Sequence, residues 1–269
     1  MNLFYLVENE YNRKKEPDFF NYVENNLNLT KDIKKADYIL VLGGDGSLLD
    51  AIQSYKDLNI PFVGIHTGSI GYYMHNINLK EELHLFDKEL EVLDFPMLNF
   101  EAKDDFGNLF KGDSFSDVWV ERSKPQSLKY HICVDNNETS KYCNVDSNLI
   151  IGDGILFSTP AGSTGYTKNL RGTIVPINTP IFQVVPMSSA IEKHTLKSFP
   201  LSLDNNSVEV FFESIDFRKG DLMYDGVEAK INGENFIPKH LKVKKSDKNV
   251  KLAFLSINEF INKSYKWIL

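Results

Sequence analysis

The first hundred residues alternate between short apolar runs and segments of helical periodicity. Parallel strands need a crossover connection, usually a helix, so this alternation is typical of a parallel β-sheet with helices on its faces. A chain with this pattern is predicted to begin with an α/β domain. The expected elements are strand 3–7, helix 19–27, strand 38–42, helix 48–55, strand 62–65 and a helix carrying Leu83, Phe86 and Leu90.

The pattern changes after Pro96. Helical periodicity becomes scarce, and short alternating runs such as 129–134 and 241–245 are separated by clusters of Asp, Asn and Gly. The sequence therefore predicts three parts. These are an α/β domain over 1–98, a β-rich domain over 99–250, and a C-terminal segment, 251–269, that packs back on the N-terminal domain.

Charge and hydropathy limit the classes of partner. The chain has 30 basic and 37 acidic residues, a net charge of −7, whereas nucleic-acid-binding proteins usually present a basic surface. The start lacks a basic segment before an apolar one, and no apolar run reaches the roughly 18 residues that a membrane helix needs. We expect a cytoplasmic protein that binds neither nucleic acid nor membrane.

The two cysteines, Cys133 and Cys143, lie in runs that resemble strands rather than a metal-binding turn. A disulfide is the less favoured alternative. We expect both to be buried or half-buried free thiols.

A glycine-rich turn, Gly43-Gly44-Asp45-Gly46-Ser47, follows the second apolar run. Glycines allow close backbone approach, so the N–H groups of this turn can face a polyphosphate, and a helix capped by Ser47 or Asp45 would add its N-terminus. A carboxylate in such a turn repels phosphate unless it holds a metal or accepts a proton from the attacking hydroxyl. Asp45 is thus a candidate general base. An ordinary Asp-Gly turn between a strand and a helix is the alternative.

A second motif spans residues 152–166 and crowds glycines, serines and threonines between Asp153 and Tyr166. Hydroxyl groups both donate and accept hydrogen bonds, and a tyrosine offers a ring face and a phenolic hydroxyl. The segment suits contact with a sugar and a base. A glycine- and serine-rich loop without chemical function is the alternative.

These two motifs, with a third block over residues 64–73, resemble the bacterial type of the NAD kinase family (ATP-NAD kinases). The Gly-Gly-Asp-Gly turn is shared with 6-phosphofructokinases and lipid kinases, so it says little about the substrate. The Thr-Pro-Ala-Gly-Ser-Thr-Gly-Tyr block at 159–166 is more specific. The resemblance covers both expected domains.

The resemblance implies phosphorylation of the adenosine ribose 2′-hydroxyl of NAD by ATP, which gives NADP. It further implies Mg²⁺, a divalent metal that arrives with ATP, no dedicated protein metal site, and a homodimer or homotetramer. The implied fold is a Rossmann-like, 6-phosphofructokinase-like N-terminal domain followed by an all-β, sandwich-like C-terminal domain.

Residue roles follow from the matched positions. Asp45 takes the place of the proton acceptor, and Gly43, Gly44 and Ser47 form the phosphate loop. His66 has two possible roles, packing at a strand end or lining the site. The substrate- and nucleotide-binding positions that the resemblance implies are Gly46, His66, Tyr72, Tyr73, Ser116, Asp117, Asp153, Thr164, Gly165, Tyr166, Asn169, Ser188 and Asp225.

Two departures from the family pattern keep other functions open. Ser116 stands where the family has asparagine, and Ile151 stands where a basic residue often precedes the Gly-Asp-Gly turn. Both changes favour a non-catalytic NAD(P)-binding sensor as the alternative. A lipid kinase is a further alternative, although an acidic chain without a basic amphipathic helix is poorly suited to a membrane surface. The five histidines other than His66 are expected to have structural or surface roles.

Overall fold

A computed structural model gives the fold. The chain divides into two compact units, Met1–Phe95 with Val250–Leu269, and Pro96–Asn249, which we call unit 1 and unit 2. No helix in the described part of the chain is both long and apolar enough to cross a membrane. The described residues are 1–68, 71–136, 140–143, 149–177, 179–189, 201–204, 206–213 and 217–268.

Unit 1 contains a parallel sheet in the order β1 (Phe4–Leu6), β2 (Tyr38–Gly43) and β3 (Phe62–His66). Every residue of β2 is buried, as expected for a central strand covered on both faces. The end of β18 (His240–Phe254) joins β3 in parallel, with Leu252 opposite Phe62. The predicted parallel sheet is confirmed.

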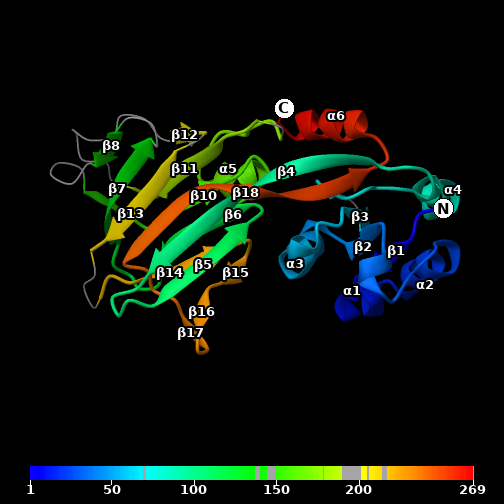
Figure 1. The fold of residues 1–269 in the computed structure, drawn as a ribbon, viewed down its shortest axis with the longest axis horizontal. Helices are drawn as coiled ribbons and strands as arrows, with labels where there is room; N and C mark the ends of the chain where they lie inside the picture. The colour runs from blue at the N-terminus through cyan, green and yellow to red at the C-terminus, as the bar shows by residue number, and fades with distance from the viewer. Residues whose placement is uncertain are drawn as a thin grey trace. The chain divides into compact units, whose positions relative to one another are not determined.

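The helices of unit 1 follow the prediction in part. Figure 1 shows α3 beside β2 and β3, where Leu48 and Ile52 are buried. The helix α1 was not predicted, because it buries no residue and therefore has no apolar periodicity. The helical elements are α1 (Glu10–Lys15), α2 (Pro17–Asn26), η1 (Ile33–Lys35), α3 (Asp45–Tyr55), η2 (Lys56–Leu58), α4 (Leu79–Glu82), η3 (Leu83–Asp87) and α6 (Ile257–Ile268).

The helix expected around Leu83, Phe86 and Leu90 is wrong in form. A single turn, α4, passes into the 3₁₀ helix η3, which ends before Leu90. Leu83 and Phe86 are still buried, because a spacing of three residues places both on one face of a 3₁₀ helix. Leu90 is buried next to the start of β4 (Glu91–Lys103).

Helix α6 belongs to unit 1 and packs there through Phe260. The ring centroid of Phe260 lies 4.2 Å from that of Phe254, 6.0 Å from Tyr72 and 6.2 Å from Tyr73 and from Phe95. Aromatic pairs at such distances add to the free energy gained from area burial alone. We call these five residues the aromatic cluster.

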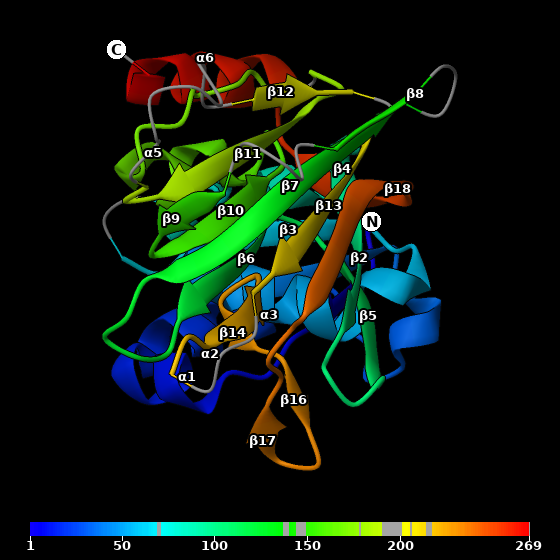
Figure 2. The same cartoon turned by 90° about the vertical axis from the view of Figure 1, so that its left-hand side faces the viewer.

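Unit 2 is rich in β-structure, as predicted. One antiparallel set has the order β12-β11-β10-β6-β14-β15, and β6, β10 and β11 run side by side in Figure 2. In the other set, β13 lies between β7 and β18. The strands whose bounds have not yet been given are β5 (Leu109–Ser114), β6 (Asp117–Arg122), β7 (Leu128–Asn136), β8 (Ser140–Cys143), β9 (Ile150–Gly152), β10 (Gly154–Ser158), β11 (Phe182–Met187), β12 (Leu201–Leu203), β13 (Ser207–Phe212), β14 (Gly220–Tyr224), β15 (Val227–Glu228), β16 (Lys230–Ile231) and β17 (Glu234–Asn235).

Buried side chains from both sets of strands form one hydrophobic cluster in unit 2. Tyr130 on β7 is fully buried within it, and its hydroxyl donates a 2.7 Å hydrogen bond to the carbonyl of Gly154 on β10. A buried phenol needs such a partner. The short helical elements η4 (Gly162–Thr164) and α5 (Tyr166–Asn169) follow β10.

The expectation of free thiols is wrong for Cys133, which is disulfide-bonded. The antiparallel register of β7 and β8 places Cys133 opposite Cys143. Directly opposed residues in an antiparallel pair have Cβ atoms about 4.5–5.5 Å apart, close to the spacing of a disulfide. The strand character of both segments was correctly predicted, but composition does not reveal the register that brings them together.

Candidate active site

The glycine-rich turn lies at the carboxyl end of β2. Gly43 ends the strand with φ +156°, and an added Cβ there would lie 2.5 Å from both Asn12 Nδ2 and Ser47 Oγ. Only glycine fits this close approach. Neither Asp45 nor Ser47 caps α3, contrary to the sequence expectation, because Gly44 occupies the N-cap in an extended conformation and Asp45 is already the first helical residue.

Asp45 holds a second segment of unit 1 in place. Its Oδ2 accepts a 2.7 Å hydrogen bond from the backbone N–H of Tyr72, and its Oδ1 accepts one of 2.9 Å from Tyr73. The side chain is half-buried. Each carboxylate oxygen has two acceptor sites, so each can still accept a further proton or hydrogen bond. Asp45 can therefore organise the turn and act as a base.

Asn12 of α1 supports the turn from the other side. Its Nδ2 donates to Ser47 Oγ at 3.0 Å and to the carbonyl of Leu42 at 3.2 Å. Asn9 caps α1 by accepting a hydrogen bond from the Asn12 N–H at 3.0 Å, and its own Nδ2 lies 3.4 Å from Ser47 Oγ. With Ser47 Oγ acting as acceptor, its hydroxyl proton remains available for a hydrogen bond.

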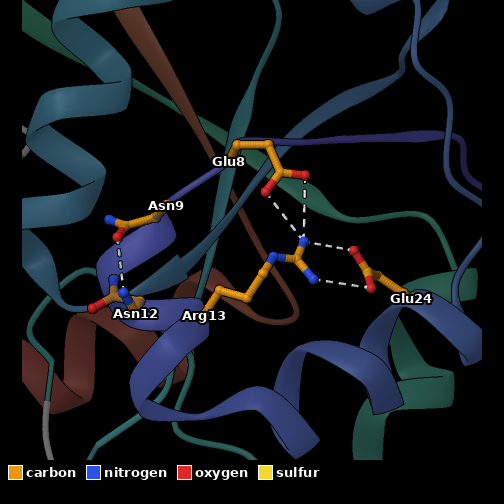
Figure 3. A network of polar contacts seen from close by, with 5 residues as sticks. All are labelled: Glu8, Asn9, Asn12, Arg13 and Glu24. Atoms are coloured by element: carbon orange, nitrogen blue, oxygen red, sulfur yellow. Dashed lines mark hydrogen bonds and ion pairs between the residues drawn. The ribbon is translucent and has the colours of Figure 1, made fainter.

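Arg13 fixes α1 relative to α2 (Figure 3). Its guanidinium lies 2.6 Å from a carboxylate oxygen of Glu24 and 3.2 Å from one of Glu8. The hydrogen bond to Glu24 is the main reason why the pKa of Arg13 is raised, and the same bond lowers the pKa of Glu24. Asn12 precedes Arg13 on α1, so these ion pairs hold the helix that carries Asn12.

His66 lies beside the same turn. The register of β2 and β3 places it opposite Gly43, and its Nδ1 accepts a 2.8 Å hydrogen bond from the N–H of Gly68. A Cβ on Gly68 or Gly71 would come within 2.9 or 2.6 Å of the imidazole ring. If the ring is neutral, its proton is therefore on Nε2, which lies 3.8 Å from the position of a Cβ on Gly44.

In unit 2, Asp225 organises the turn between β5 and β6. The buried carboxylate accepts hydrogen bonds from Ser114 Oγ at 2.7 Å and from the N–H of Phe115 at 2.8 Å. The N–H and Oγ of Ser116 lie 2.7 and 2.9 Å from it, and the N–H of Asp117 lies at 3.2 Å. The Ser116 hydroxyl is thus bound within the turn. Such a set of donors stabilises a buried negative charge.

Asp117 is a second buried carboxyl group beside Asp225. Burial, and then the like charge of Asp225, raises its pKa to about 7. Thr167 Oγ1 donates to its Oδ1 at 3.4 Å, and Ser158 also contributes a hydrogen bond. An added Cβ on Gly162 would lie 2.3 Å from that oxygen. The glycine- and serine-rich motif therefore packs directly against Asp117.

The outer part of the motif brings Asp153 and Tyr166 near one strand end. Asp153 Oδ1 forms a 2.8 Å ion pair with Arg122 Nε, and its N–H donates to the carbonyl of Met187. The ring of Tyr166 lies 5.7 Å from that of Trp119 in an edge-on arrangement. Burial, and then the nearby carboxylates, raises the pKa of Tyr166.

The structure groups the predicted positions within each unit. In unit 1 the turn, His66, Tyr72 and Tyr73 lie together; in unit 2 Ser116, Asp117 and Asp225 form one cluster. Ser188 is exposed in a left-handed conformation (φ +45°) directly after β11. Thr164 is half-buried in η4, whereas Gly165 and Asn169 are exposed at its end and in α5.

Sequence reasoning missed several residues that complete these clusters. Asn12 lies on a helix without apolar periodicity, and Thr167 falls one position after the recognised motif. Trp119 has a buried indole Nε1 without a hydrogen-bond partner among the described residues. The spacing of the two asparagines, Asn9-x-x-Asn12, was the one available signal, since asparagine is a favoured N-cap.

Comparisons of the sequence with known proteins point to a single family. Residues 3–82 match the family model described as the ATP-NAD kinase N-terminal domain. The NAD kinase of Rickettsia canadensis is 30% identical over 181 residues, covering 67% of this chain and 68% of that protein. The NAD kinase of Rickettsia typhi is 29% identical over 223 residues, covering 82% and 81%.

Two solved structures share the fold at low sequence identity. Yeast NADH kinase complexed with NADH has a TM-score of 0.74 at 16% identity, with 98% of this chain and 86% of that chain covered. An NAD kinase from Archaeoglobus fulgidus in complex with ATP has a TM-score of 0.64 at 20% identity, with 99% and 97% covered.

A glycine-rich turn that places a carboxylate at a helix N-terminus is an arrangement found in phosphoryl-transfer enzymes, which is the class that unit 1 indicates. Together with the 30% identity over two thirds of the Rickettsia canadensis protein, it leads to one conclusion: the chain belongs to the NAD kinase family.

Proposed function

We propose that this protein is an ATP-dependent NAD kinase, which transfers the γ-phosphoryl group of ATP to the adenosine ribose 2′-hydroxyl of NAD and forms NADP. Family membership supports the reaction. The observation that carries the mechanism is the half-buried carboxylate of Asp45, the first residue of α3. It is held by the backbone N–H groups of Tyr72 and Tyr73.

In this reaction the ribose oxygen attacks the γ-phosphorus, a new P–O bond forms, and the bond to the β-phosphate oxygen breaks with its electron pair leaving on ADP. Asp45 accepts the proton of the attacking hydroxyl. The N–H bonds from Tyr72 and Tyr73 fix both carboxylate oxygens, so the base is oriented before the substrate arrives. Backbone N–H groups of Gly43, Gly44 and Ser47 and the N-terminus of α3 balance negative charge on the phosphates.

Further residues are proposed to bind the nucleotides. Gly46 meets the reacting ribose and phosphates, and Tyr72 and Tyr73 serve the base. Asp117 and Asp225 are proposed nucleotide-binding positions that also hold the turn carrying Ser116, since the Asp225 carboxylate accepts hydrogen bonds from residues of that turn. The other proposed nucleotide-binding positions are His66, Asp153, Thr164, Gly165, Tyr166, Asn169 and Ser188.

A kinase that uses ATP requires a divalent metal, for which we propose Mg²⁺. Among the described residues no group of three or more His, Cys, Asp or Glu side chains could hold a metal ion. The part of the chain that the structure describes therefore offers no dedicated metal site. Mg²⁺ binds substrate phosphates and keeps several of its waters, so the metal is treated as part of the ATP substrate.

The finer description of the protein stays a proposal. We propose a Rossmann-like, 6-phosphofructokinase-like domain over 1–98, a sandwich-like domain over 99–250 and a returning segment over 251–269. The boundaries of the two compact units support this division. A cytoplasmic location and a homodimer or homotetramer follow from the sequence and the family resemblance alone.

The test is NADP formation from NAD and Mg·ATP by the purified protein, read with an NADP-specific dehydrogenase. Asp45→Asn is expected to lower turnover at least about a hundredfold, which is the lower end of the range typical for the loss of a general base. Asp50→Asn is the matched control, because Asp50 is an exposed carboxylate on the same helix. Wild-type turnover in Asp45→Asn would remove the assigned base.

One feature of Asp45→Asn needs its own control. The amide offers one acceptor oxygen where the carboxylate offered two, so either Tyr72 or Tyr73 loses a partner at a cost of about 1–3 kcal/mol. NAD binding and the unfolding midpoint of the variant are therefore measured beside its turnover. Binding without any turnover in the wild type would favour the sensor function, and transfer to lipid in vesicles would favour the lipid kinase.

A further inference from the structure

Lys263 of α6 contacts the segment that holds Asp45. Its Nζ donates a 2.9 Å hydrogen bond to the carbonyl of Met74. Met74 directly follows Tyr72 and Tyr73, whose N–H groups donate to the two oxygens of Asp45. One short segment is thus bound at its start by the carboxylate and at its end by a lysine almost 190 positions later in the chain.

A second side chain of α6, Phe260, also contacts the segment 72–74. Phe260 lies three residues before Lys263, so both side chains project from one face of α6. Its ring packs against the rings of Tyr72 and Tyr73 in the aromatic cluster. The apolar contact and the Lys263 hydrogen bond therefore fix three consecutive residues, and the backbone N–H groups of two of these set the orientation of Asp45.

The environment of Lys263 is unusual for a lysine. Burial lowers its pKa, and the negative charge of Asp45 opposes that shift. Desolvating an ammonium group is costly unless partners compensate, yet the exposed Lys266 on the same helix shows that α6 can place a lysine in water. The position of Lys263 thus calls for a role beyond solubility.

We propose that Lys263 is a positioning residue for the phosphoryl-transfer reaction, which locks the segment 72–74 so that the Asp45 carboxylate stays aimed, and which places a positive charge near that carboxylate. The proposal rests on the proposed function. In this role Lys263 acts on Asp45 through Met74, Tyr72 and Tyr73 and is assigned no contact with the reacting atoms.

Three variants test the role. Lys263→Met keeps the length and apolar stem but removes the charge and the donor, and it is expected to lower kcat about tenfold or more with the KM for NAD changed less than about threefold. Lys266→Met is the matched control and should retain wild-type kcat. Lys263→Arg should restore most of kcat, because a cavity of about 450 Å³ beside Lys263, Met74 and Phe260 leaves room for the larger guanidinium.

Amide hydrogen exchange gives a readout that does not depend on activity. In Lys263→Met the Tyr72 and Tyr73 amides should exchange at least about tenfold faster relative to the wild type, since their segment has lost its second attachment. Lys263→Arg and Lys266→Met should not show this change. Should Lys263→Met fail to fold, Lys263→Leu, which also removes both the charge and the donor, takes its place with the same expected results.

The outcomes separate the two proposals. Unchanged kcat together with unchanged exchange at Tyr72 and Tyr73 in Lys263→Met overturns the role of Lys263. A fall in kcat that Lys263→Arg does not restore, with no change in exchange, also overturns it. If Asp45→Asn keeps full turnover, the proposed base fails, and faster exchange in Lys263→Met would then show only that Lys263 holds the segment.

Discussion

Unit 1 and unit 2 each contain aspartates bound by backbone N–H groups, but the two arrangements differ in what they leave available. Asp45 is half-buried and accepts one N–H on each oxygen. Asp225 is 5% exposed and accepts hydrogen bonds from three N–H groups and two hydroxyls of a single turn. The first carboxylate keeps acceptor sites that the proposed reaction would use, whereas the second anchors the turn between β5 and β6 through its hydrogen bonds.

The comparison shows that a hydrogen-bonded aspartate is not by itself a catalytic group. A general base needs an accessible lone pair as well as a fixed orientation. Asp45 has both, and it lies at the N-terminus of a helix, where anionic groups are stabilised. Asp225 is oriented as well, but it is nearly inaccessible in this structure. The predictions below would sharpen this difference or abolish it.

The largest effect is expected for Asp225→Ala. Removing the acceptor leaves several buried donors without partners, so the free energy of unfolding should fall by about 4–5 kcal/mol. Urea denaturation measures the loss. Asp221→Ala, on the same strand β14, serves as the control and should cost about 1 kcal/mol or less. A similarly small loss in Asp225→Ala would mean that Asp225 is no anchor.

Asp117 should give unit 2 a stability that falls as pH rises. Its folded-state pKa of about 7 is above the ordinary value of 3.8, so the folded protein binds more protons between these values, and the stabilisation is fully present only below pH 3.8. Its contribution should decrease by up to roughly 4 kcal/mol as pH rises to about 7. Asp117→Asn should remove this dependence in unfolding curves measured across that range; an unchanged pH profile would contradict the assignment.

His75 should act in the opposite direction in unit 1. Its Nδ1 lies 2.8 Å from the carbonyl of Gly64, its Nε2 accepts the N–H of Leu255 at 3.1 Å, and burial lowers its pKa from 6.5 to about 4. The contribution of neutral His75 to the free energy of unfolding is therefore complete above pH 6.5, and it falls by about 3 kcal/mol as the pH drops to 4.

His75→Asn should flatten this limb of the profile, since an amide can replace the donor to Gly64 but does not titrate. His84→Asn, at an exposed histidine, is the control and should keep the wild-type slope. Equal slopes in His75→Asn and the wild type would show that another group titrates.

The smallest expected effect concerns the support of the glycine-rich turn. Asn12→Ala removes the hydrogen bonds to Ser47 and Leu42 and should lower the free energy of unfolding by about 1 kcal/mol. Because the glycine-rich turn then loses one of its supports, turnover should fall although the loss of stability is small. Lys15→Ala on the same helix provides the comparison. Equal turnover in both variants would exclude a role for α1 in positioning the turn.

Local patterns in the sequence predicted most of the fold. The parallel strands of unit 1 follow from their apolar runs, and the strand-to-helix turn at Gly43 follows from glycine chemistry. What the sequence did not reveal depends on contacts between distant residues. The pairing of Cys133 needs the register of β7 and β8, and Lys263 reaches Met74 only after α6 has folded back onto unit 1.

The candidate site shows the same limit. Asp45 was identifiable because a carboxylate inside a glycine turn is chemically unusual, but its hydrogen bonds to Tyr72 and Tyr73 were not predictable from spacing. Asn12 escaped notice because α1 buries nothing, and periodicity detects only helices that have an apolar face.

The most direct test of the central claim is a single-turnover measurement of phosphoryl transfer from Mg·ATP to NAD, with Asp45→Asn compared to Asp50→Asn and the wild type. We expect Asp45→Asn to bind NAD nearly as the wild type does and to transfer at least about a hundredfold more slowly, with Asp50→Asn unchanged. Transfer at the wild-type rate in Asp45→Asn would contradict the account, because the reaction would then proceed without the carboxylate on which it depends.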